Sequence, residues 1–207
     1  MKPLNQCHGR CYCPSLCSRR PCRGTIYIYM TNAISEFDQA AYLKIRENVS
    51  AFIAKQADLH DSESITLLDI APQVHAGAKQ FFLKSQVDTA DIDPLSGADY
   101  IIDITRNNAA TIPDEMFDLV VCTEVLEHTV QPFAAVDEIF RMLKKGGLLL
   151  MTTPFNFRIH GPLPDCWRFS EHGIRALLTK FDSVQITPLE DEDRFLMPIH
   201  YTTIAKK

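Results

Sequence analysis

The segment from Phe117 to Phe169 constrains the fold more than any other part of this chain. It reads in order as an apolar strand, an acidic turn, a helix, a Gly-Gly pair, a second buried strand and a loop rich in polar and aromatic residues. An apolar strand that runs directly into Thr123 and Glu124 is typical of a parallel sheet, which is buried on both faces and binds ligands at the carboxyl edge of its strands. The segment therefore predicts an open α/β sheet with a ligand site at that edge.

Further strand and helix patterns surround this segment. Ser35 and Asp38 resemble a capping box, and the apolar residues Ile45, Val49 and Phe52 then recur at helical spacing. Strands are expected at 64–71, 87–92, 99–104, 117–122, 148–153, 184–187 and 200–205, and further helices at 76–84, 132–144 and 170–181. Right-handed crossovers would place helices on both faces of one sheet, so we expect a Rossmann-like, doubly wound, seven-stranded and mostly parallel α/β fold.

The helix expected at 132–144 has an apolar face that should pack on the sheet, formed by Phe133, Val136, Ile139, Phe140 and Leu143. The pair Gly146 and Gly147 follows it and predicts a helix C-cap and a turn, because glycine adopts the left-handed conformation that ends many helices.

The N-terminal segment differs in composition from the rest of the chain. Five of the seven cysteines fall within the first 22 residues. The whole chain has 207 residues, of which 46% are hydrophobic, and this is enough for one well-filled domain. The cysteine spacing lacks the paired C-x-x-C knuckles of common zinc modules. We expect residues 1–29 to be a Cys-rich basic extension that is disordered or not native, and residues 30–207 to form the domain. Zinc binding and a disulfide cluster remain open for the extension.

Charge and hydropathy exclude two classes of partner. The net charge is −5, and residues 1–29 contain five Lys or Arg and no acid, so the domain itself is more acidic than the whole chain. Nonspecific nucleic-acid binding needs a basic surface, and a membrane-spanning helix needs roughly 20 apolar residues in a row. Neither is present in the sequence, nor is the apolar region of a signal peptide. We expect a cytoplasmic protein that does not bind nucleic acid and has no membrane-spanning segment.

Several motifs resemble a known family. The strand ending in CTEVLEH, the helix ending in RMLKKGG and the strand ending in TTPF resemble the later motifs of class I S-adenosylmethionine-dependent methyltransferases. The stretch RIHGPLPDCWRF and the helix SEHGIRALL are similar to a subgroup whose substrates are small metabolites such as sugars. The resemblance covers about residues 36–207. It implies an enzyme that uses S-adenosyl-L-methionine, and a sheet that ends in an antiparallel strand.

Three aspartates stand at the ends of successive expected strands. The resemblance implies that Asp91 accepts hydrogen bonds from both ribose hydroxyls, that Asp69 orients the first turn or reaches the methionine amino group through water, and that Asp103 lies beside adenine. The amide of Ile104 would then bond a ring nitrogen. Each aspartate alone is also compatible with capping a turn or a helix, and Asp93 competes with Asp91 for the ribose.

The first loop departs from the family pattern. The family alternates glycines after the first strand, whereas this chain reads DIAPQVHAG, with Ala71, Gln73 and His75 in place of glycines and only Gly77 retained. Ala71 and Gly77 are still expected to contact the cofactor. The altered loop keeps open a catalytically silent homologue, and it disfavours a dinucleotide-binding dehydrogenase, which needs its glycines beneath a pyrophosphate.

The end of the fourth strand supplies the next candidates. Cys122, Thr123 and Glu124 are expected to line the cofactor pocket, with His128 one turn further on. By resemblance this stretch lies next to the sulfonium, where a carboxylate is favourable. The alternative is that Glu127 and His128 only cap or pair at the surface.

The loop after the fifth strand carries the expected catalytic residues. An oxygen acceptor must lose a proton during methyl transfer, and we assign His160 as general base, Asp165 to orient it or a substrate hydroxyl, and Arg168 to an anionic substrate group. Trp167 is expected to stack on a sugar face. Four aromatic residues are expected as walls: Phe155, Phe157, Trp167 and Phe169.

A structural role for the same loop is the alternative. Two prolines would then make it rigid, Trp167 and Phe169 would belong to the core, and Asp165 and Arg168 would form a structural ion pair. No metal site is predicted here.

Three functions follow from these observations. The leading one is methyl transfer from S-adenosyl-L-methionine to a small-molecule acceptor, an oxygen of a sugar or glycan precursor. The second is a silent protein of the same fold that regulates or scaffolds a partner. The third is a metal-binding adaptor built on the Cys-rich start.

Overall fold

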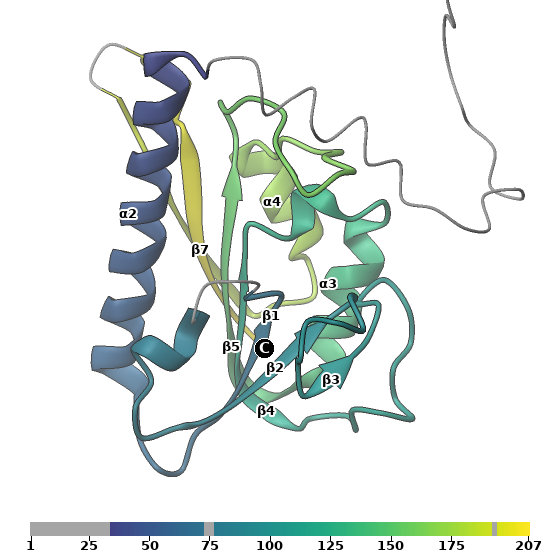
Figure 1. Cartoon of the computed structure of the whole chain (residues 1–207). Helices are drawn as coiled ribbons and strands as arrows, with labels where there is room; N and C mark the ends of the chain where they lie inside the picture. The colour runs from purple at the N-terminus through teal and green to yellow at the C-terminus, as the bar shows by residue number, and fades with distance from the viewer. Residues whose placement is uncertain (1–33, 73–76, 192–193) are drawn as a thin grey trace, which may run out of the picture. The chain divides into compact units, whose positions relative to one another are not determined.

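Seven strands form one sheet in the order β3-β2-β1-β4-β5-β7-β6 (Figure 1). The structure is a computed structural model that describes residues 34–72, 77–191 and 194–207. The strands are β1 (Thr66–Ile70), β2 (Gln86–Asp91), β3 (Tyr100–Ile101), β4 (Phe117–Thr123), β5 (Leu143–Pro154), β6 (Ser183–Leu189) and β7 (His200–Lys206). Strand β7 runs antiparallel to both of its neighbours, and the other pairs are parallel. The mostly parallel sheet with an antiparallel last strand, expected from the sequence, is confirmed.

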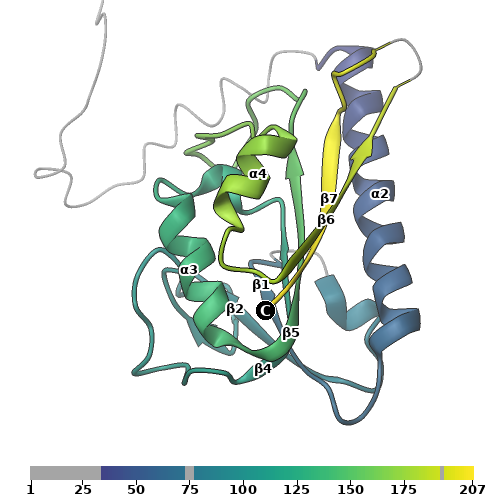
Figure 2. The same ribbon diagram turned by 180° about the vertical axis from the view of Figure 1, so that it is seen from behind.

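Helices cover both faces of the sheet. They are α2 (Glu36–His60), α3 (Pro132–Met142) and α4 (Glu171–Leu177), with short 3₁₀ helices η1 (Gly77–Gln80) and η2 (Leu126–His128). Figures 1 and 2 show α2 on one side of the sheet and α3 and α4 on the other. This arrangement is the doubly wound architecture that the sequence predicts.

Alternation along the central strands explains why both faces are covered. In β4, Leu119 and Val121 belong to the apolar cluster beneath α2, whereas Val120 and Cys122 belong to the cluster beneath α3 and α4. All four side chains are buried. Because successive side chains of a strand point to opposite faces, a run of apolar residues fits a sheet that is buried on both sides.

Helix α2 begins at Glu36, directly after Ser35, and runs for 25 residues along one face of the sheet. Its buried residues fall at helical spacing: Ala41, Ile45, Val49, Phe52, Ile53, Gln56 and Ala57. The apolar stripe expected from the sequence is therefore the packing face of α2.

Helix α3 is shorter than expected. It starts with Pro132 in its first turn and ends at Met142. Phe133, expected in the core, is 61% exposed because it lies on the side of α3 away from the buried residues. Gly146 and Gly147 are not a helix cap: they lie within β5, where the pairing with β4 shifts register and Gly146 has φ +77°.

The helix expected at 76–84 is also wrong in extent. The described part is only the one turn of η1, and the chain reaches β2 at Gln86. Strand β3 likewise holds two residues, since Asp103 begins a turn instead of continuing the strand. The expected extension at 1–29, with its cysteines, lies outside the described residues.

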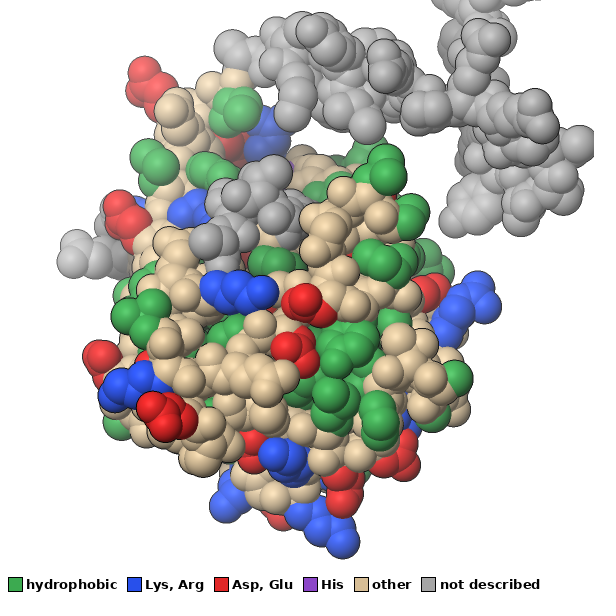
Figure 3. All heavy atoms as spheres, turned by 60° about the horizontal axis from the view of Figure 1, so that its bottom comes forward, with side chains coloured by type: hydrophobic (Ala, Val, Ile, Leu, Met, Phe, Trp, Pro, Cys, Tyr) green, Lys and Arg blue, Asp and Glu red, His purple; other side chains and the backbone are tan. Residues whose placement is uncertain are grey.

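Two surface features of the described residues bear on the expected partners. None of the described helices has the length and apolar character needed to cross a membrane. On the face drawn in Figure 3, acidic and basic side chains are interspersed around a group of hydrophobic ones. That face therefore does not present the continuous basic surface that nonspecific nucleic-acid binding requires.

Candidate active site

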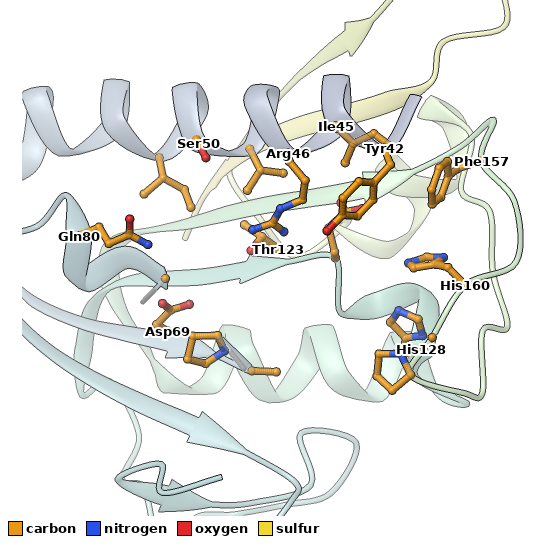
Figure 4. Close-up of a pocket in the computed structure, with 18 of the residues that line it drawn as sticks. Tyr42, Ile45, Arg46, Ser50, Asp69, Gln80, Thr123, His128, Phe157 and His160 are labelled. Atoms are coloured by element: carbon orange, nitrogen blue, oxygen red, sulfur yellow. The ribbon is translucent and has the colours of Figure 1, made fainter. Parts of the chain in front are cut away.

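Two adjoining cavities lie at the carboxyl ends of the parallel strands. The larger has a volume of about 920 Å³ and lies over the ends of β2 and β3, and the smaller, of about 160 Å³, lies between α2 and the loop after β5 (Figure 4). Ala71, Glu124, His128 and Pro162 line both cavities, so the two form one elongated cleft. Open α/β sheets bind their ligands at this edge.

Asp69 anchors the first loop beneath the smaller cavity. Its buried carboxylate accepts a hydrogen bond of 2.7 Å from the backbone N–H of Ala78. Burial raises the pKa of Asp69 to about 6, although the Ala78 N–H and the charge of Lys79 partly oppose this. A Cβ atom at Gly77 would lie 2.1 Å from Asp69 Oδ2, so the one glycine that this loop retains is needed for the contact.

Ala71 explains part of the departure from the glycine pattern. It has φ +52°, in the left-handed region that glycine adopts without strain, and it lines both cavities. Glu124, at the corresponding position after β4, has φ +56°. Ala71 thus adopts the backbone conformation that a glycine would otherwise provide. Gln73 and His75, the other two residues that replace glycines, lie outside the described residues.

Helix α2 adds polar residues that sequence reasoning missed. Tyr42, Arg46 and Ser50 line the smaller cavity, and Figure 4 shows Arg46 pointing from α2 toward Thr123. Arg46 makes no ion pair with any described residue. In the sequence, these three residues could have been recognised by their spacing of four residues, which places them on one face of the helix next to its apolar stripe.

The larger cavity collects the aspartates at the ends of β2 and β3. Asp91, Asp103 and Ile104, which the sequence singled out, all line it, and so does Asp93, the alternative to Asp91. Asp91 accepts a hydrogen bond of 2.8 Å from the N–H of Asp93 through Oδ1.

Asp103 makes more hydrogen bonds within its own turn than Asp91 does. Its carboxylate accepts bonds from the Thr105 backbone and hydroxyl and from Arg106. Both the cofactor role and the turn role proposed for Asp103 are therefore compatible with its position.

Of the predicted residues at the end of β4, Thr123 and Glu124 line the cleft and Cys122 does not. The Cys122 side chain is fully buried in the cluster beneath α3 and α4, and burial raises the pKa of its thiol far above the ordinary value. Because alternate strand residues face opposite sides, the thiol points into the core when its neighbours face the cavity.

Glu124 is held directly by residues from two other strands, and one of these is in turn contacted by α2. It accepts a hydrogen bond of 2.9 Å from Thr152 Oγ1 in β5 and lies 2.6 Å from His200 Nε2 in β7, while Asn48 of α2 lies 3.0 Å from His200 Nδ1. Burial alone would raise the pKa of Glu124, but His200 and Thr152 together bring it below its ordinary value. Glu124 is thus a fixed negative charge at the rim shared by the two cavities.

Glu127 is buried without a hydrogen-bond partner. Its side chain is 0% exposed, neither carboxylate oxygen has a partner among the described residues, and Oε1 lies 3.7 Å from Nε2 of both His128 and His160. Burial, followed by the charge of Glu124, raises the pKa of Glu127 well above its ordinary value. The alternative that Glu127 caps or pairs at the surface is excluded by its burial.

His160, Asp165 and Arg168 are brought together as predicted. Asp165 Oδ2 lies 3.0 Å from His160 Nδ1, although the angle is outside hydrogen-bonding geometry, and it accepts a bond of 2.9 Å from the His160 backbone N–H. Burial lowers the pKa of His160, and Asp165 partly opposes that shift. His160 lines the smaller cavity, and Figure 4 shows its ring next to that of His128.

Arg168 does not face a substrate site. All five of its N–H donors are used, by Asp165 and by the backbone oxygens of Phe157, Arg158 and Trp167. No donor remains for a substrate anion. The structural ion pair with Asp165 that the sequence left open is the arrangement observed, and Arg168 acts by holding Asp165.

Only one of the four expected aromatic walls lines the cleft. Phe157 does so, with its ring centroid 5.2 Å from that of His160. Trp167 is 42% exposed and donates its Nε1 proton to Thr129 O, while Phe155 and Phe169 pack on the core. The predicted wall therefore fails because three of the four side chains turn away from the cavity.

Comparison with known proteins agrees with this architecture. The profile of a family described as a methyltransferase domain matches residues 49–151. The chain is 33% identical over 89 residues to a ubiquinone biosynthesis O-methyltransferase of Xanthomonas campestris pv. campestris (strain B100), a match covering 43% of this chain and 33% of that protein. The match therefore spans about a third of the length of that curated relative.

Solved structures share the fold. N-methyltransferase NodS of Bradyrhizobium japonicum, in complex with S-adenosylhomocysteine, gives a TM-score of 0.57 at 15% identity and covers 84% of this chain and 99% of its own. A methyltransferase from Archaeoglobus fulgidus, described as dependent on S-adenosylmethionine, gives a TM-score of 0.57 at 16% identity. That match covers 78% of this chain and 94% of the other. At these identities the comparison concerns the fold alone.

The seven-stranded sheet, its antiparallel β7 and the cleft at its carboxyl edge define a Rossmann-like protein with a ligand-binding cleft. The matching profile identifies a methyltransferase domain over residues 49–151, and the chain shares its fold with S-adenosylmethionine-dependent methyltransferases of class I. S-adenosyl-L-methionine is the cofactor of that family. The narrower subgroup suggested by the RIHG loop stays a prediction.

Proposed function

We propose that this chain binds S-adenosyl-L-methionine along the two cavities and transfers its methyl group to an oxygen of a small molecule. The observation that carries the proposal is the pair of opposite charges in the smaller cavity, Arg46 and Asp69, which matches the carboxylate and ammonium of a methionine. Asp91, which lines the larger cavity, would accept hydrogen bonds from the ribose hydroxyls. Ala71 and Glu124 at the shared rim would then flank the sulfonium.

The acceptor would enter beside His160 in the smaller cavity. Methyl transfer is an in-line displacement, so the protein mainly aligns the acceptor with the sulfonium and excludes water. His160 lines the cavity, and the carboxylate of Asp165 lies 3.0 Å from its Nδ1, so His160 is the candidate general base. The curated relative is an O-methyltransferase by name, which favours oxygen as the acceptor atom.

A sugar or glycan precursor remains an untested prediction for the acceptor. The expected stacking platform, Trp167, lines neither cavity, so nothing in the cleft supports a sugar in particular. The cytoplasmic location expected from the sequence likewise stays a prediction.

The first experiment is a calorimetric titration of S-adenosylmethionine and S-adenosylhomocysteine into the full chain. Micromolar affinity is expected for both. Asp91→Ala should weaken binding ten-fold or more, because a hydrogen bond to a charged group contributes roughly 1.5 to 3 kcal/mol. Asp93→Ala is the matched control and should bind like the wild type.

The silent homologue is the competing function. Its support is the altered first loop, in which Ala71 replaces a glycine. No binding at millimolar ligand would overturn the proposed methyl transfer and favour a regulatory or scaffolding role.

A further inference from the structure

We propose that Glu127, His128 and His160 form a binding site for one divalent transition-metal cation. One side-chain ligand atom from each of the three lies within 4.8 Å of the other two. Glu127 Oε1 is 3.7 Å from Nε2 of each histidine. Ligand atoms at bond lengths of about 2.1 Å from one cation lie about 3 to 3.5 Å apart, so small side-chain rotations bring all three into coordination.

The state of Glu127 is the second, independent observation. Its side chain is fully buried, and both carboxylate oxygens lack a hydrogen-bond partner among the described residues. Buried carboxylates are normally paired, hydrogen-bonded or bound to a metal, because a bare one is costly. The groups nearest to Oε1 by ion-pair distance are the two imidazoles, so a cation among the three would satisfy it.

Each histidine has a polar group close to its Nδ1 atom, on the side of the ring away from Glu127. His128 Nδ1 lies 2.9 Å from the carbonyl oxygen of Pro164, which can only accept, so Nδ1 donates to it and Nε2 is the nitrogen left on the side of Glu127. Asp165 lies 3.0 Å from His160 Nδ1 and is itself held by Arg168. Metal-binding histidines in proteins commonly make such contacts to a carbonyl or a carboxylate.

The ligand set selects the kind of cation. Two imidazoles and one carboxylate suit Mn²⁺, Fe²⁺, Co²⁺ or Zn²⁺, whereas Ca²⁺ and Mg²⁺ prefer oxygen ligands throughout. Three protein ligands on one side leave positions open for oxygen atoms of a substrate or of water. The chemistry therefore fits a first-row transition cation with an accessible face.

The location links the cation to the acceptor, and this step rests on the proposed function. His128 and His160 both line the smaller cavity, with Thr123 on its floor (Figure 4). A hydroxyl bound to a cation there loses its proton at lower pH, so the cation would replace His160 as the group that activates the acceptor. The proton passes to water, the methyl group forms a bond to oxygen, and the electrons of the broken carbon–sulfur bond remain on sulfur as a neutral thioether.

Mn²⁺ is the probe that separates this site from the N-terminal cysteines, because thiolates favour Zn²⁺ and Cu⁺ over Mn²⁺. The full chain, stripped with a chelator, would be titrated with MnCl₂ by calorimetry and by the paramagnetic resonance signal of free Mn²⁺. One equivalent should bind to the wild type. Glu127→Gln and His160→Ala should each weaken binding ten-fold or more, and His172→Ala, an exposed histidine of α4, is the matched control and should not.

Folding and cofactor binding are measured on the same samples. Glu127→Gln replaces an unpartnered buried carboxyl group by an amide of nearly the same shape and breaks no hydrogen bond of the described residues, so its melting temperature without metal should be close to that of the wild type. Failure of the wild type to bind Mn²⁺, or equal affinity in the Glu127 and His160 variants, overturns the proposed site. S-adenosylhomocysteine titration tests the proposed function separately, since metal binding without cofactor binding would contradict methyl transfer and leave the metal site standing.

Discussion

At the scale of single residues, the contact between Asp69 and Gly77 decides whether the first loop can form. Gly77 has φ +57°, and an added Cβ would meet Asp69 Oδ2 and the Pro72 side chain at 2.1 and 2.8 Å. Gly77→Ala therefore combines a steric clash with a strained backbone, and we expect a loss of about 2 to 4 kcal/mol in the free energy of unfolding. Urea unfolding measures it.

Gly97 provides the control for backbone strain alone. It has φ +76° but open space around the position of a Cβ atom. Gly97→Ala should cost only about 1 kcal/mol. Equal losses in the two variants would show that the contact with Asp69 is not what requires a glycine at position 77.

The raised pKa of Asp69 predicts a pH dependence of stability. The folded protein keeps this proton up to a pH of about 6, whereas the unfolded chain releases it near 3.8. The folded state thus loses stability as the pH rises from about 4 to about 6, and above that it carries a buried charge costing up to about 3 kcal/mol. Asp69→Asn lacks this charge.

The measurement is urea unfolding of both proteins, without cofactor, at pH 4 and pH 8. The difference in unfolding free energy, Asn variant minus wild type, should increase between these pH values. An unchanged difference would mean that Asp69 is ionised at an ordinary pKa in the folded protein.

At the scale of elements, substitutions in α3 can show which face of this helix packs against the sheet. Ile139 is fully buried beneath α3, while Phe133 on the same helix is largely exposed. Ile139→Ala should lower the unfolding free energy by about 2 to 5 kcal/mol through lost burial and a cavity, and Phe133→Ala by less than about 1 kcal/mol. Thermal unfolding of the two variants checks this directly.

A large loss for Phe133→Ala would indicate that its ring is covered in solution, by another chain or by residues outside the described ranges. That result would support the packing role that the sequence predicts for Phe133.

The pattern of apolar residues predicted a strand or helix correctly where the residues of that pattern are also the ones buried in the fold. The apolar runs of β1, β4 and β5 are buried on both faces and were recognisable without any partner. Apolar residues at helical spacing also identified α2, but Phe133 in α3 fits the same pattern and faces outward. The Gly-Gly pair after α3 was misassigned because glycine serves a helix cap and an irregular strand equally well.

At the scale of the whole molecule, the site depends on contacts between distant parts of the chain. Glu124 is fixed by His200, 76 residues away, and His200 is in turn contacted by Asn48, 152 residues away. Arg46 reaches the cavity only because α2 crosses the sheet above Thr123 (Figure 4). The strand-end aspartates were predictable from sequence order, whereas these residues have no local signal that distinguishes them from surface or core positions.

The division of the cleft into two cavities predicts that its two halves can be disabled separately. Arg46→Gln removes the cation of the smaller cavity, and Asp91→Ala removes the acid of the larger one. Under the proposed binding mode, Arg46→Gln should weaken S-adenosylhomocysteine ten-fold or more and leave adenosine affinity unchanged, because adenosine has no carboxylate. Asp91→Ala should weaken both ligands by similar factors, because both carry the ribose.

Competition calorimetry with the two ligands gives all four affinities. Lys44→Gln is the matched control for charge on α2, since Lys44 pairs with Asp191 and lines neither cavity. A loss of adenosine affinity in the Arg46 variant would place the nucleoside in the smaller cavity and reverse the proposed orientation. The acceptor would then lie at the ends of β2 and β3, away from the cluster of Glu127, His128 and His160.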